Sequence, residues 1–472
     1  MALRYYTKLV KSLRLFQHAK ARYRTLFGCL ALSICFLLVV RRPYLEFPIE
    51  TVYPKLWKGS GGPSLLMIGN KDSSQQLAAK SEKRIFPSNS ICDISKPRSN
   101  FCEMKGDIRI KGNSSEILLV SSSQMGRYLE NETWKIRPYA RKEDPTAMSG
   151  VRELSLKSFT GQDQAPNCSI YHSVPALVFS TAGYTGNYFH DFTDVLVPLF
   201  ITSRQYHGDI QFLIANFQAW WVDKYYVILK QLSKYEIINF DHDHRVHCFS
   251  NTLVGLRFHR ELSIDPSRSP NGYSMHDFIR FLRRSYSLAR DFAITTGHNV
   301  GRKPRLMIVP RKRTRAFTNV GEIVEMAETL GYEVVILEAE FGASLSEVSR
   351  IVNSCDVMMG VHGAGLTNAV FLPTNAVLIQ VVPFEVDWPA RSAFGKPSVD
   401  MKIRYLEYKI EEKESTLSEQ YPHDHPVLRD PGSISKQGWV AFGSIYLDKQ
   451  NITLDVARFK DTLLQALELL HH

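Results

Sequence analysis

Acidic side chains are absent from the first 42 residues of this 472-residue chain, although the same segment holds nine basic residues. A formal net charge of +11 would otherwise point to a nucleic-acid partner. Without that segment, the rest of the chain carries a net charge of about +2, which is close to neutral for a globular protein of this size. The positive charge therefore belongs to an N-terminal tail, and we expect no nucleic-acid partner.

Long hydrophobic runs are also scarce. One run of 15 residues, Leu26 to Val40, stands out, and arginines flank it on both sides. A membrane-spanning helix usually needs about 20 apolar residues, but thin early-secretory membranes accept shorter spans. A cleaved signal peptide and a core helix are the alternatives, although no small-residue cleavage site follows the run. Seven basic residues before it predict a cytosolic N-terminus and a lumenal C-terminal bulk.

Internal repeats and long low-complexity tracts are missing as well, so the length predicts two ordinary globular domains behind this anchor. A stretch rich in Gly, Pro and Ser reads as a flexible stem. We expect the last helix either to stay with the second domain or to pack back on the first. The predicted segments are a basic cytosolic tail (1–24), a transmembrane anchor (25–40), the stem (41–85), an N-terminal domain (86–300) and a C-terminal domain (301–472).

Only five cysteines follow the anchor, and an odd number in an oxidising compartment predicts two disulfides and one free thiol. We pair Cys92 with Cys102, which closes a short loop, and Cys168 with Cys248. Cys355 opens an apolar strand and is expected to stay reduced in the core. The sequence alone does not determine this connectivity. Four Asn-x-Ser/Thr sequons agree with a lumenal location. They are Asn113, Asn131, Asn167 and Asn451.

Strand and helix patterns alternate with short connections from residue 305 onward. Apolar runs predict four buried strands, and periodic segments at 320–331 and 345–354 predict the helices between the first three of them. Asn319 stands at the cap of the first helix and Gly331 at its end. This alternation predicts a parallel, Rossmann-like sheet. The four strands are RLMIV (305–309), YEVVILE (332–338), DVMMGV (356–361) and AVLIQVV (376–382).

The N-terminal part mixes shorter strand and helix patterns. EILLVSS (116–122), PALVFS (175–180), IQFLIA (210–215) and EIIN (236–239) predict strands. Between the last two, WWVDKYYVILKQL (220–232) has helical spacing. We assign its aromatic residues to the core rather than to a platform that stacks on sugars.

Neither a dinucleotide fingerprint nor a Walker loop is present. Instead, the third C-terminal strand runs into a glycine-rich turn, where the backbone and the next helix suit an anion. Arg311 and Arg315 follow the first strand, and we expect their guanidinium groups to bind a diphosphate in a bidentate way. For Lys312 and Arg313, which belong to the same basic run, a solvated surface charge is the alternative. The turn comprises His362, Gly363, Ala364, Gly365, Leu366, Thr367 and Asn368.

GYTGNYFHDFTDVLVPLF (183–200) carries a second group of chemically active residues at the start of a predicted helix. His190 and Asp194 are four apart, so both lie on one helical face. A carboxylate that orients an imidazole makes a general base that works near neutral pH. Asp191 is the alternative orienting group, and an acidic cluster that only favours the helix dipole is the structural alternative.

A third cluster, Asp241-His242-Asp243-His244 with His247, resembles a metal site only loosely. Asp-x-Asp suits Mn²⁺, but two aspartates are a weak pattern, and the histidine spacing fits no standard zinc site. We interpret the segment as a solvated loop and predict no bound metal.

Several segments together resemble glycosyltransferase family 61, in particular its plant members. They are CDISKPRSNFCEMKGDIRI, GYTGNYFHDFTDVLVPLF, HCFSNTLVGL, SCDVMMGVHGAGLTNAVFLP, YPHDHPVLRDP and QNITLDVARF, spread from about Cys92 to the C-terminus. The resemblance implies an α/β GT-B fold, in which two Rossmann-like domains face a cleft and the C-terminal one holds the donor nucleotide. It also implies a UDP-sugar donor, inversion at the anomeric carbon and no resident cofactor or metal.

For a plant member, the resemblance implies transfer of arabinofuranose or xylose onto xylan or a related glycan. We expect a single-pass type II protein of the Golgi membrane, alone, as a homodimer or in a complex with other glycosyltransferases. Asn319, Glu385 and Trp388 are further candidates for holding the donor. The alternatives are a UDP-N-acetylglucosamine or xylose transferase that acts on protein glycans, and an inactive lumenal glycan-binding partner.

Overall fold

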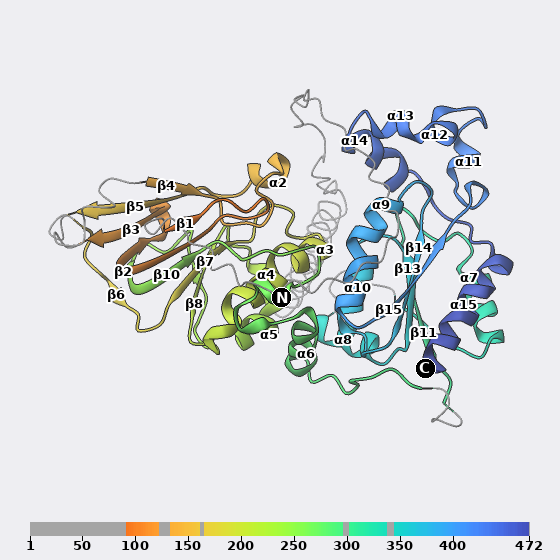
Figure 1. Cartoon of the computed structure of the whole chain (residues 1–472), viewed down its shortest axis with the longest axis horizontal. Helices are drawn as coiled ribbons and strands as arrows, with labels where there is room; N and C mark the ends of the chain where they lie inside the picture. Colours follow the sequence, from red (N-terminus) through yellow and green to blue (C-terminus); the bar gives the residue numbers. More distant parts are fainter. Residues whose placement is uncertain (1–90, 122–132, 161–164, 296–301, 338–343, 472) are drawn as a thin grey trace, which may run out of the picture. The chain divides into compact units, whose positions relative to one another are not determined.

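The computed structural model describes residues 91–121, 133–160, 165–295, 302–337 and 344–471 (Figure 1). All of them belong to one compact unit. The predicted tail, anchor and stem and the sequon at Asn131 lie outside these ranges. Within these ranges, no helix combines the length and the apolar character needed to cross a bilayer.

A ten-stranded mixed sheet forms the N-terminal half, in the order β4-β5-β3-β2-β10-β7-β8-β9, with β1 beside β2 and β6 beside β10. β2 runs antiparallel to β3 and to β10, whereas β10, β7, β8 and β9 run parallel to one another. The strands are β1 (Cys92–Asp93), β2 (Phe101–Lys111), β3 (Glu116–Ser121), β4 (Thr133–Ile136), β5 (Leu154–Thr160), β6 (Ile170–Tyr171), β7 (Ala176–Ser180), β8 (Gln211–Ala215), β9 (Ile238–Asn239) and β10 (Val246–Val254).

The predicted Rossmann-like pattern is therefore only part of this sheet. Helices separate β7, β8 and β9, as a parallel arrangement requires. By contrast, β2 and β3 are joined by a three-residue 3₁₀ turn, which is long enough only for antiparallel neighbours. The helices of this half are α2 (Pro145–Ser149), α3 (Tyr188–His190), the π-helical segment η4 (Asp191–Leu196), α4 (Val197–Ser203), α5 (Ala219–Leu232) and α6 (Met275–Ser285).

A five-stranded sheet with every neighbour parallel forms the C-terminal half, in the order β12-β11-β13-β14-β15. Four of its strands match the predicted ones, and β15 adds an edge strand of alternating polarity. The strands are β11 (Arg305–Val309), β12 (Glu333–Ile336), β13 (Val357–Val361), β14 (Val377–Val382) and β15 (Arg404–Lys409). The helices are α7 (Val320–Thr329), α8 (Leu345–Asn353), the 3₁₀ segment η8 (Ala364–Phe371), α9 (Asp387–Ala390), η9 (Arg391–Gly395), α10 (Lys396–Asp400), α11 (Leu417–Gln420), α12 (Pro426–Arg429), α13 (Pro431–Ser435), α14 (Trp439–Phe442), η11 (Gly443–Leu447) and α15 (Val456–His471).

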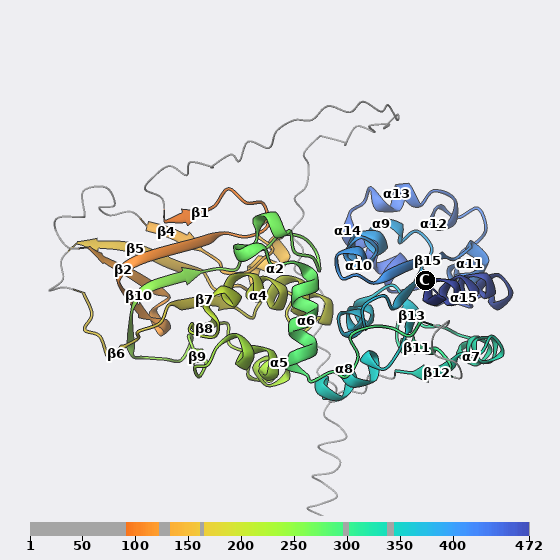
Figure 2. The same cartoon turned by 60° about the horizontal axis from the view of Figure 1, so that its bottom comes forward.

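Successive side chains of β11 point to opposite faces of this sheet, and each face packs in a different hydrophobic core. Leu306 and Ile308 pack with α7 and α15, whereas Met307 and Val309 face the core that contains α8 and η8. Figure 1 and Figure 2 show α7 and α15 together on one side of the sheet. The last helix therefore packs on its own sheet, through residues such as Phe459, and not on the N-terminal half.

One hydrophobic core joins residues from both halves of the chain. The ring of Phe192, in η4, lies edge-on to Phe278 of α6 and to Phe371 of η8. Arg283 of α6 is buried, and its guanidinium donates to the carbonyl of Leu372, 2.8 Å away. The two sheets are thus held together by packed side chains around η4 and η8, where the predicted site residues lie.

Both predicted disulfides are present, and they tie the N-terminal sheet together. Cys92 pairs with Cys102, and Cys168 with Cys248. Cys355 is free and buried, as expected. Of the described sequons, Asn113 and Asn167 are exposed, whereas Asn451 is half-buried and accepts a hydrogen bond from the backbone of Ala316.

Candidate active site

The helix that carries His190 begins after a tight turn behind β7. Gly183 has a φ of 65°, and a Cβ there would overlap the ring of Tyr139, so only glycine fits. Asn187 caps the helix by accepting from the N–H of Phe189. Further on, Pro198 lacks the N–H that would bond to the carbonyl of Asp194, and the helix widens into η4. Such π-helical segments are frequent at functional sites.

Within this helix, Nδ1 of His190 lies 2.9 Å from Oδ2 of Asp194. The same oxygen accepts from Nε of Arg141 at 2.8 Å and from the hydroxyl of Tyr139 at 2.9 Å. Asp194 is fully buried, whereas the His190 side chain keeps 19% of its surface exposed. The pair thus has the arrangement predicted for an oriented general base: a buried carboxylate behind a reachable imidazole.

Charge around Asp194 keeps the carboxylate ionised. Burial opposes ionisation, but the hydrogen bond from His190 and the positive charge of Arg141 hold the pKa of Asp194 below its ordinary value. Arg141 is held in turn by Glu261, 3.1 Å away, which also accepts from Arg98 and from Thr193. Because a buried carboxylate needs its partners, these residues fix the position of Asp194.

Asp191 has a different role from the one left open in the sequence. Its Oδ1 accepts from the N–H of Gly186 at 2.8 Å and from Nε1 of Trp221 at 3.0 Å. Its Oδ2 accepts from the hydroxyl of Tyr225 at 2.7 Å. All these bonds anchor the turn before α3 to helix α5. Asp194, and not Asp191, therefore orients His190.

Arg311 and Arg315 lie against the glycine-rich turn at the carboxyl ends of β11 and β13. Gly363 has a φ of 152°, and a Cβ there would overlap the guanidinium of Arg311. Nη1 of Arg315 donates to the carbonyl of His362 at 3.1 Å, and Nε of Arg311 donates to that of Thr314 at 2.7 Å. The structure therefore brings the two predicted arginines to the predicted turn.

These two guanidiniums are largely buried and have no ion pair with a carboxylate within the part of the chain that is described. Burial lowers the pKa of Arg311. Burial, together with the charge of Arg311, lowers the pKa of Arg315 to about 10. The charge of Asp448 offsets these two shifts only in part. Two desolvated positive charges side by side are unfavourable unless an anion joins them. The arrangement is that of an anion-binding site.

His362 adds a neutral donor to this site. Nε2 of Gln380 donates to its Nδ1 at 2.8 Å, so the ring proton stays on Nε2. Burial and the charges of Arg315 and Arg311 lower the pKa of His362 to about 3. At neutral pH its ring therefore presents an N–H donor without charge.

Contacts between α3 and η8 connect the two groups of residues. The hydroxyl of Tyr188 donates to Oδ1 of Asn368 at 3.0 Å, and Nδ2 of Asn368 donates to the carbonyl of Gly365. The ring of Phe394 lies 5.6 Å from that of Phe189 and 5.9 Å from that of His362. The helix of His190 thus rests directly on the anion-binding turn.

The surroundings of the other residues predicted to bind the donor give less support for that role. The side chain of Asn319 does not cap α7, because both ends of its amide bond to the backbone of Leu454. Glu385 follows β14 at a φ of 64°, and burial raises the pKa of its carboxyl. Trp388, at the start of α9, is 73% exposed. Asn319 is therefore structural, while Glu385 and Trp388 remain available to a ligand.

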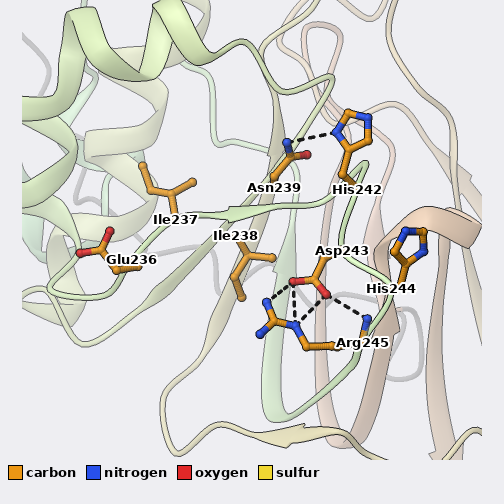
Figure 3. Close-up of a pocket in the computed structure, with 8 residues that line it drawn as sticks. All are labelled: Glu236, Ile237, Ile238, Asn239, His242, Asp243, His244 and Arg245. Atoms are coloured by element: carbon orange, nitrogen blue, oxygen red, sulfur yellow. Dashed lines mark hydrogen bonds and ion pairs between the residues drawn. The ribbon is translucent and has the colours of Figure 1, made fainter.

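Residues 242–245 of the Asp241–His247 cluster, together with residues 236–239, line a shallow hollow of about 520 Å³ (Figure 3). Figure 3 shows Arg245 folded onto Asp243, while His242 turns to Asn239. Asp241 is likewise paired, with Arg152 at 2.6 Å. Two carboxylates that already bind arginines do not converge on one point as a cation site requires. His242 and His244 are exposed, as expected for a solvated loop, whereas His247 lies in β10 and is buried, so the prediction is wrong for His247.

Residues that matter for the site but give no signal in the sequence include Tyr139, Arg141, Glu261 and Gln380. Tyr139 and Arg141 stand in an irregular segment, and Glu261 follows a strand by several residues. The roles of Tyr139, Arg141 and Glu261 depend on contacts across about 50 to 120 residues of sequence, and that of Gln380 on a contact across 18. No local spacing rule detects such contacts.

Comparisons with known proteins point to the same region. The family model described as Glycosyltransferase 61 matches residues 188–379, from α3 to β14. Alpha-1,3-arabinosyltransferase XAT2 of Oryza sativa subsp. japonica is 47% identical over 401 residues, which are 85% of this chain and 68% of that protein. Beta-1,2-xylosyltransferase XYXT1 of the same organism is 45% identical over 424 residues, 87% of this chain and 90% of the other. Xylan glycosyltransferase MUCI21 of Arabidopsis thaliana is 38% identical over 390 residues, 79% and 78% of the two chains.

Proposed function

The chain belongs to glycosyltransferase family 61, and we propose that it transfers a pentose, arabinofuranose or xylose, from a UDP-sugar onto a xylan-type polysaccharide. Its rice relatives are named as an arabinosyltransferase and a xylosyltransferase, which supports the sugar, and its Arabidopsis relative is named as a xylan glycosyltransferase, which supports the acceptor. The single observation that carries the mechanism is the hydrogen bond from Tyr188 to Asn368, which rests the helix of His190 on the anion-binding turn.

The diphosphate of the donor would bind at this turn. Arg311 and Arg315 supply two positive charges, and Nε2–H of His362 supplies a neutral hydrogen bond. Charge grows on the leaving diphosphate as its bond to the sugar breaks, so these groups stabilise the transition state more than the ground state. Glu385 would accept from donor hydroxyls, and no metal is needed for this step.

His190 would act as the base. Its Nδ1 donates to Asp194, so the lone pair is on Nε2. Nε2 takes the proton from an acceptor hydroxyl while that oxygen bonds to the anomeric carbon from the face opposite the diphosphate. The bond from that carbon to the diphosphate breaks, and its electron pair leaves with UDP. The configuration inverts, and Asp194 stabilises the imidazolium that forms.

We also propose that the chain is a single-pass type II protein of the Golgi membrane with its catalytic part in the lumen. The basic tail before the run at 26–40 and the two disulfides support this location. A fluorescent fusion of the whole chain should co-localise with a Golgi marker, and the exposed sequons at Asn113 and Asn167 should carry glycans. Diffuse cytosolic fluorescence with unmodified sequons would refute the proposal.

The activity is tested with the full-length chain from a eukaryotic host, held in detergent. It is incubated with xylohexaose and, separately, with UDP-arabinofuranose, UDP-xylose and UDP-N-acetylglucosamine, with and without a chelator. We expect one pentose to be added, equally well with chelator. Transfer of N-acetylglucosamine, or UDP binding without any transfer, would favour a protein-glycan transferase or an inactive partner instead.

A further inference from the structure

Two adjacent tryptophans at the start of α5 have opposite environments. Trp221 is buried and donates to Asp191, whereas Trp220 keeps 48% of its surface exposed. The prediction that the aromatic residues of this helix belong to the core is therefore correct for Trp221 and Tyr225, which are buried, and wrong for Trp220 and Tyr226, which are exposed. Single exposed aromatic side chains are common on proteins, so the surroundings of Trp220 decide what it can do.

The indole of Trp220 lies beside the turn that leads to His190. A Cβ on Gly186 would come within 3.6 Å of Cη2 of Trp220. Gly186 is exposed and has a φ of 108°, which disfavours any side chain that would cover the indole. Asn187 then caps α3, and His190 is the last residue of that short helix. An exposed path over Gly186 and Asn187 thus joins the indole to the proposed base.

Polar groups border this indole. Lys224 follows Trp220 by four residues on the same face of α5, but its ammonium pairs with Asp191 at 3.5 Å. Gln218 is exposed and accepts from Nε1 of Trp220 at 3.3 Å. Asp223 follows Trp220 by three residues, so both lie on one face of α5. Asp223 is exposed, and its carboxylate has no hydrogen bond or ion pair with any described residue. An aromatic face bordered by amide and carboxylate groups suits a pyranose ring, whose C–H face stacks while its hydroxyls donate at the edge.

We propose that Trp220 is an acceptor subsite: it stacks on a pyranose ring of the polysaccharide chain, some units away from the ring whose hydroxyl meets His190. This inference rests on the proposed transferase function and deepens it. The proposed ligand is a neutral, extended glycan, because the surface beside Trp220 offers hydrogen-bond acceptors. A short acceptor that occupies only the His190 position does not reach this subsite.

The test compares Trp220→Ala with Tyr226→Ala, each in the full-length chain in detergent. Tyr226 is a matched control, because it is 49% exposed on the same helix but faces another side. We expect Trp220→Ala to raise KM for xylohexaose about tenfold, which corresponds to about 1.4 kcal/mol, with the KM for xylobiose unchanged. The KM of Trp220→Phe for xylohexaose should lie between those of the wild type and Trp220→Ala. The KM of Tyr226→Ala should equal that of the wild type. Equal KM values for xylohexaose in the wild type and Trp220→Ala overturn the inference.

Equilibrium binding of xylohexaose separates this inference from the transferase proposal. Weaker binding by Trp220→Ala, in a chain that transfers no sugar, supports the subsite while the transferase proposal fails. Unchanged binding by Trp220→Ala, in a chain that does transfer, overturns the subsite and leaves the transferase proposal intact. Absence of xylohexaose binding by the wild type also overturns it. Thermal melting of each variant checks that the fold is intact.

Discussion

The imidazole of His190 and the carboxylate of Asp194 are joined by a hydrogen bond of 2.9 Å between residues four apart on one helix. The bond fixes Nδ1 as the donor, so Nε2 is the nitrogen that can accept a proton. Tyr139 and Arg141 hold the same carboxylate oxygen from behind. The base is therefore oriented by the folded chain before any substrate binds.

Replacement of His190 by Ala should lower kcat by a factor of about 10² to 10⁴, because a positioned base is lost. UDP affinity should stay the same, since the arginines and the turn are untouched. His242→Ala is the matched control, because His242 is exposed and its ring bonds, among the described residues, to Asn239 alone. Transfer rates with each variant and UDP titration measure both effects. Full activity in His190→Ala would remove this residue from the mechanism.

The two unpaired guanidiniums predict opposite effects on stability and on binding. Arg311→Met removes one of two buried like charges, so the unliganded protein should gain about 1 kcal/mol of unfolding free energy. The same variant should bind UDP at least tenfold more weakly, because an ion-pair partner of the diphosphate is lost, on the order of 1.5 to 3 kcal/mol. Thermal melting with and without UDP measures both changes.

Arg313→Met is the control for this variant, since Arg313 is exposed in the same loop. It should change neither quantity by much, as most surface substitutions do not. If Arg311→Met destabilised the unliganded protein and left UDP binding unchanged, the guanidinium would be structural.

Local patterns predicted the C-terminal half well. The apolar runs at 305–309 and 376–382 form β11 and β14, and the glycine-rich turn lies at a strand end as parallel sheets require. Strand β15 was not predicted, because an edge strand alternates in polarity and lacks a continuous apolar run. The long antiparallel pair β2 and β10 could not be foreseen, since its partners are about 140 residues apart.

The site residues, like the fold, were predicted from the sequence only in part. Spacing alone put His190 and Asp194 on one face, but it left Asp191 open as the alternative orienting group. Only the contacts of Asp191 with Trp221 and Tyr225 show that its carboxylate is already occupied. Similarly, periodicity could not distinguish Trp220 from Trp221, because adjacent residues on a helix differ by about 100° and the boundary of the core falls between them.

His362 predicts a loss of stability on acidification. Its pKa in the folded protein is about 3, against an ordinary value of 6.5, so below pH 6.5 the unfolded chain binds a proton that the folded chain does not. Unfolding free energy therefore falls as the pH drops from 7 to 5, by about 2 kcal/mol from this residue. His362→Gln should remove that part of the slope. Urea titrations at both pH values measure it, and equal slopes in the two proteins would contradict the assignment.

The two disulfides should differ in what they contribute to stability. The bond between Cys168 and Cys248 spans 80 residues of sequence, whereas that between Cys92 and Cys102 spans 10. In the chain-entropy account, the longer loop stabilises by about 4.5 kcal/mol and the shorter by about 2.7 kcal/mol. Paired Cys→Ser variants at each bond, compared by urea unfolding, should rank in that order. A larger loss at Cys92 and Cys102 would mean that native packing around β1 and β2, and not the entropy of the unfolded chain, determines the effect.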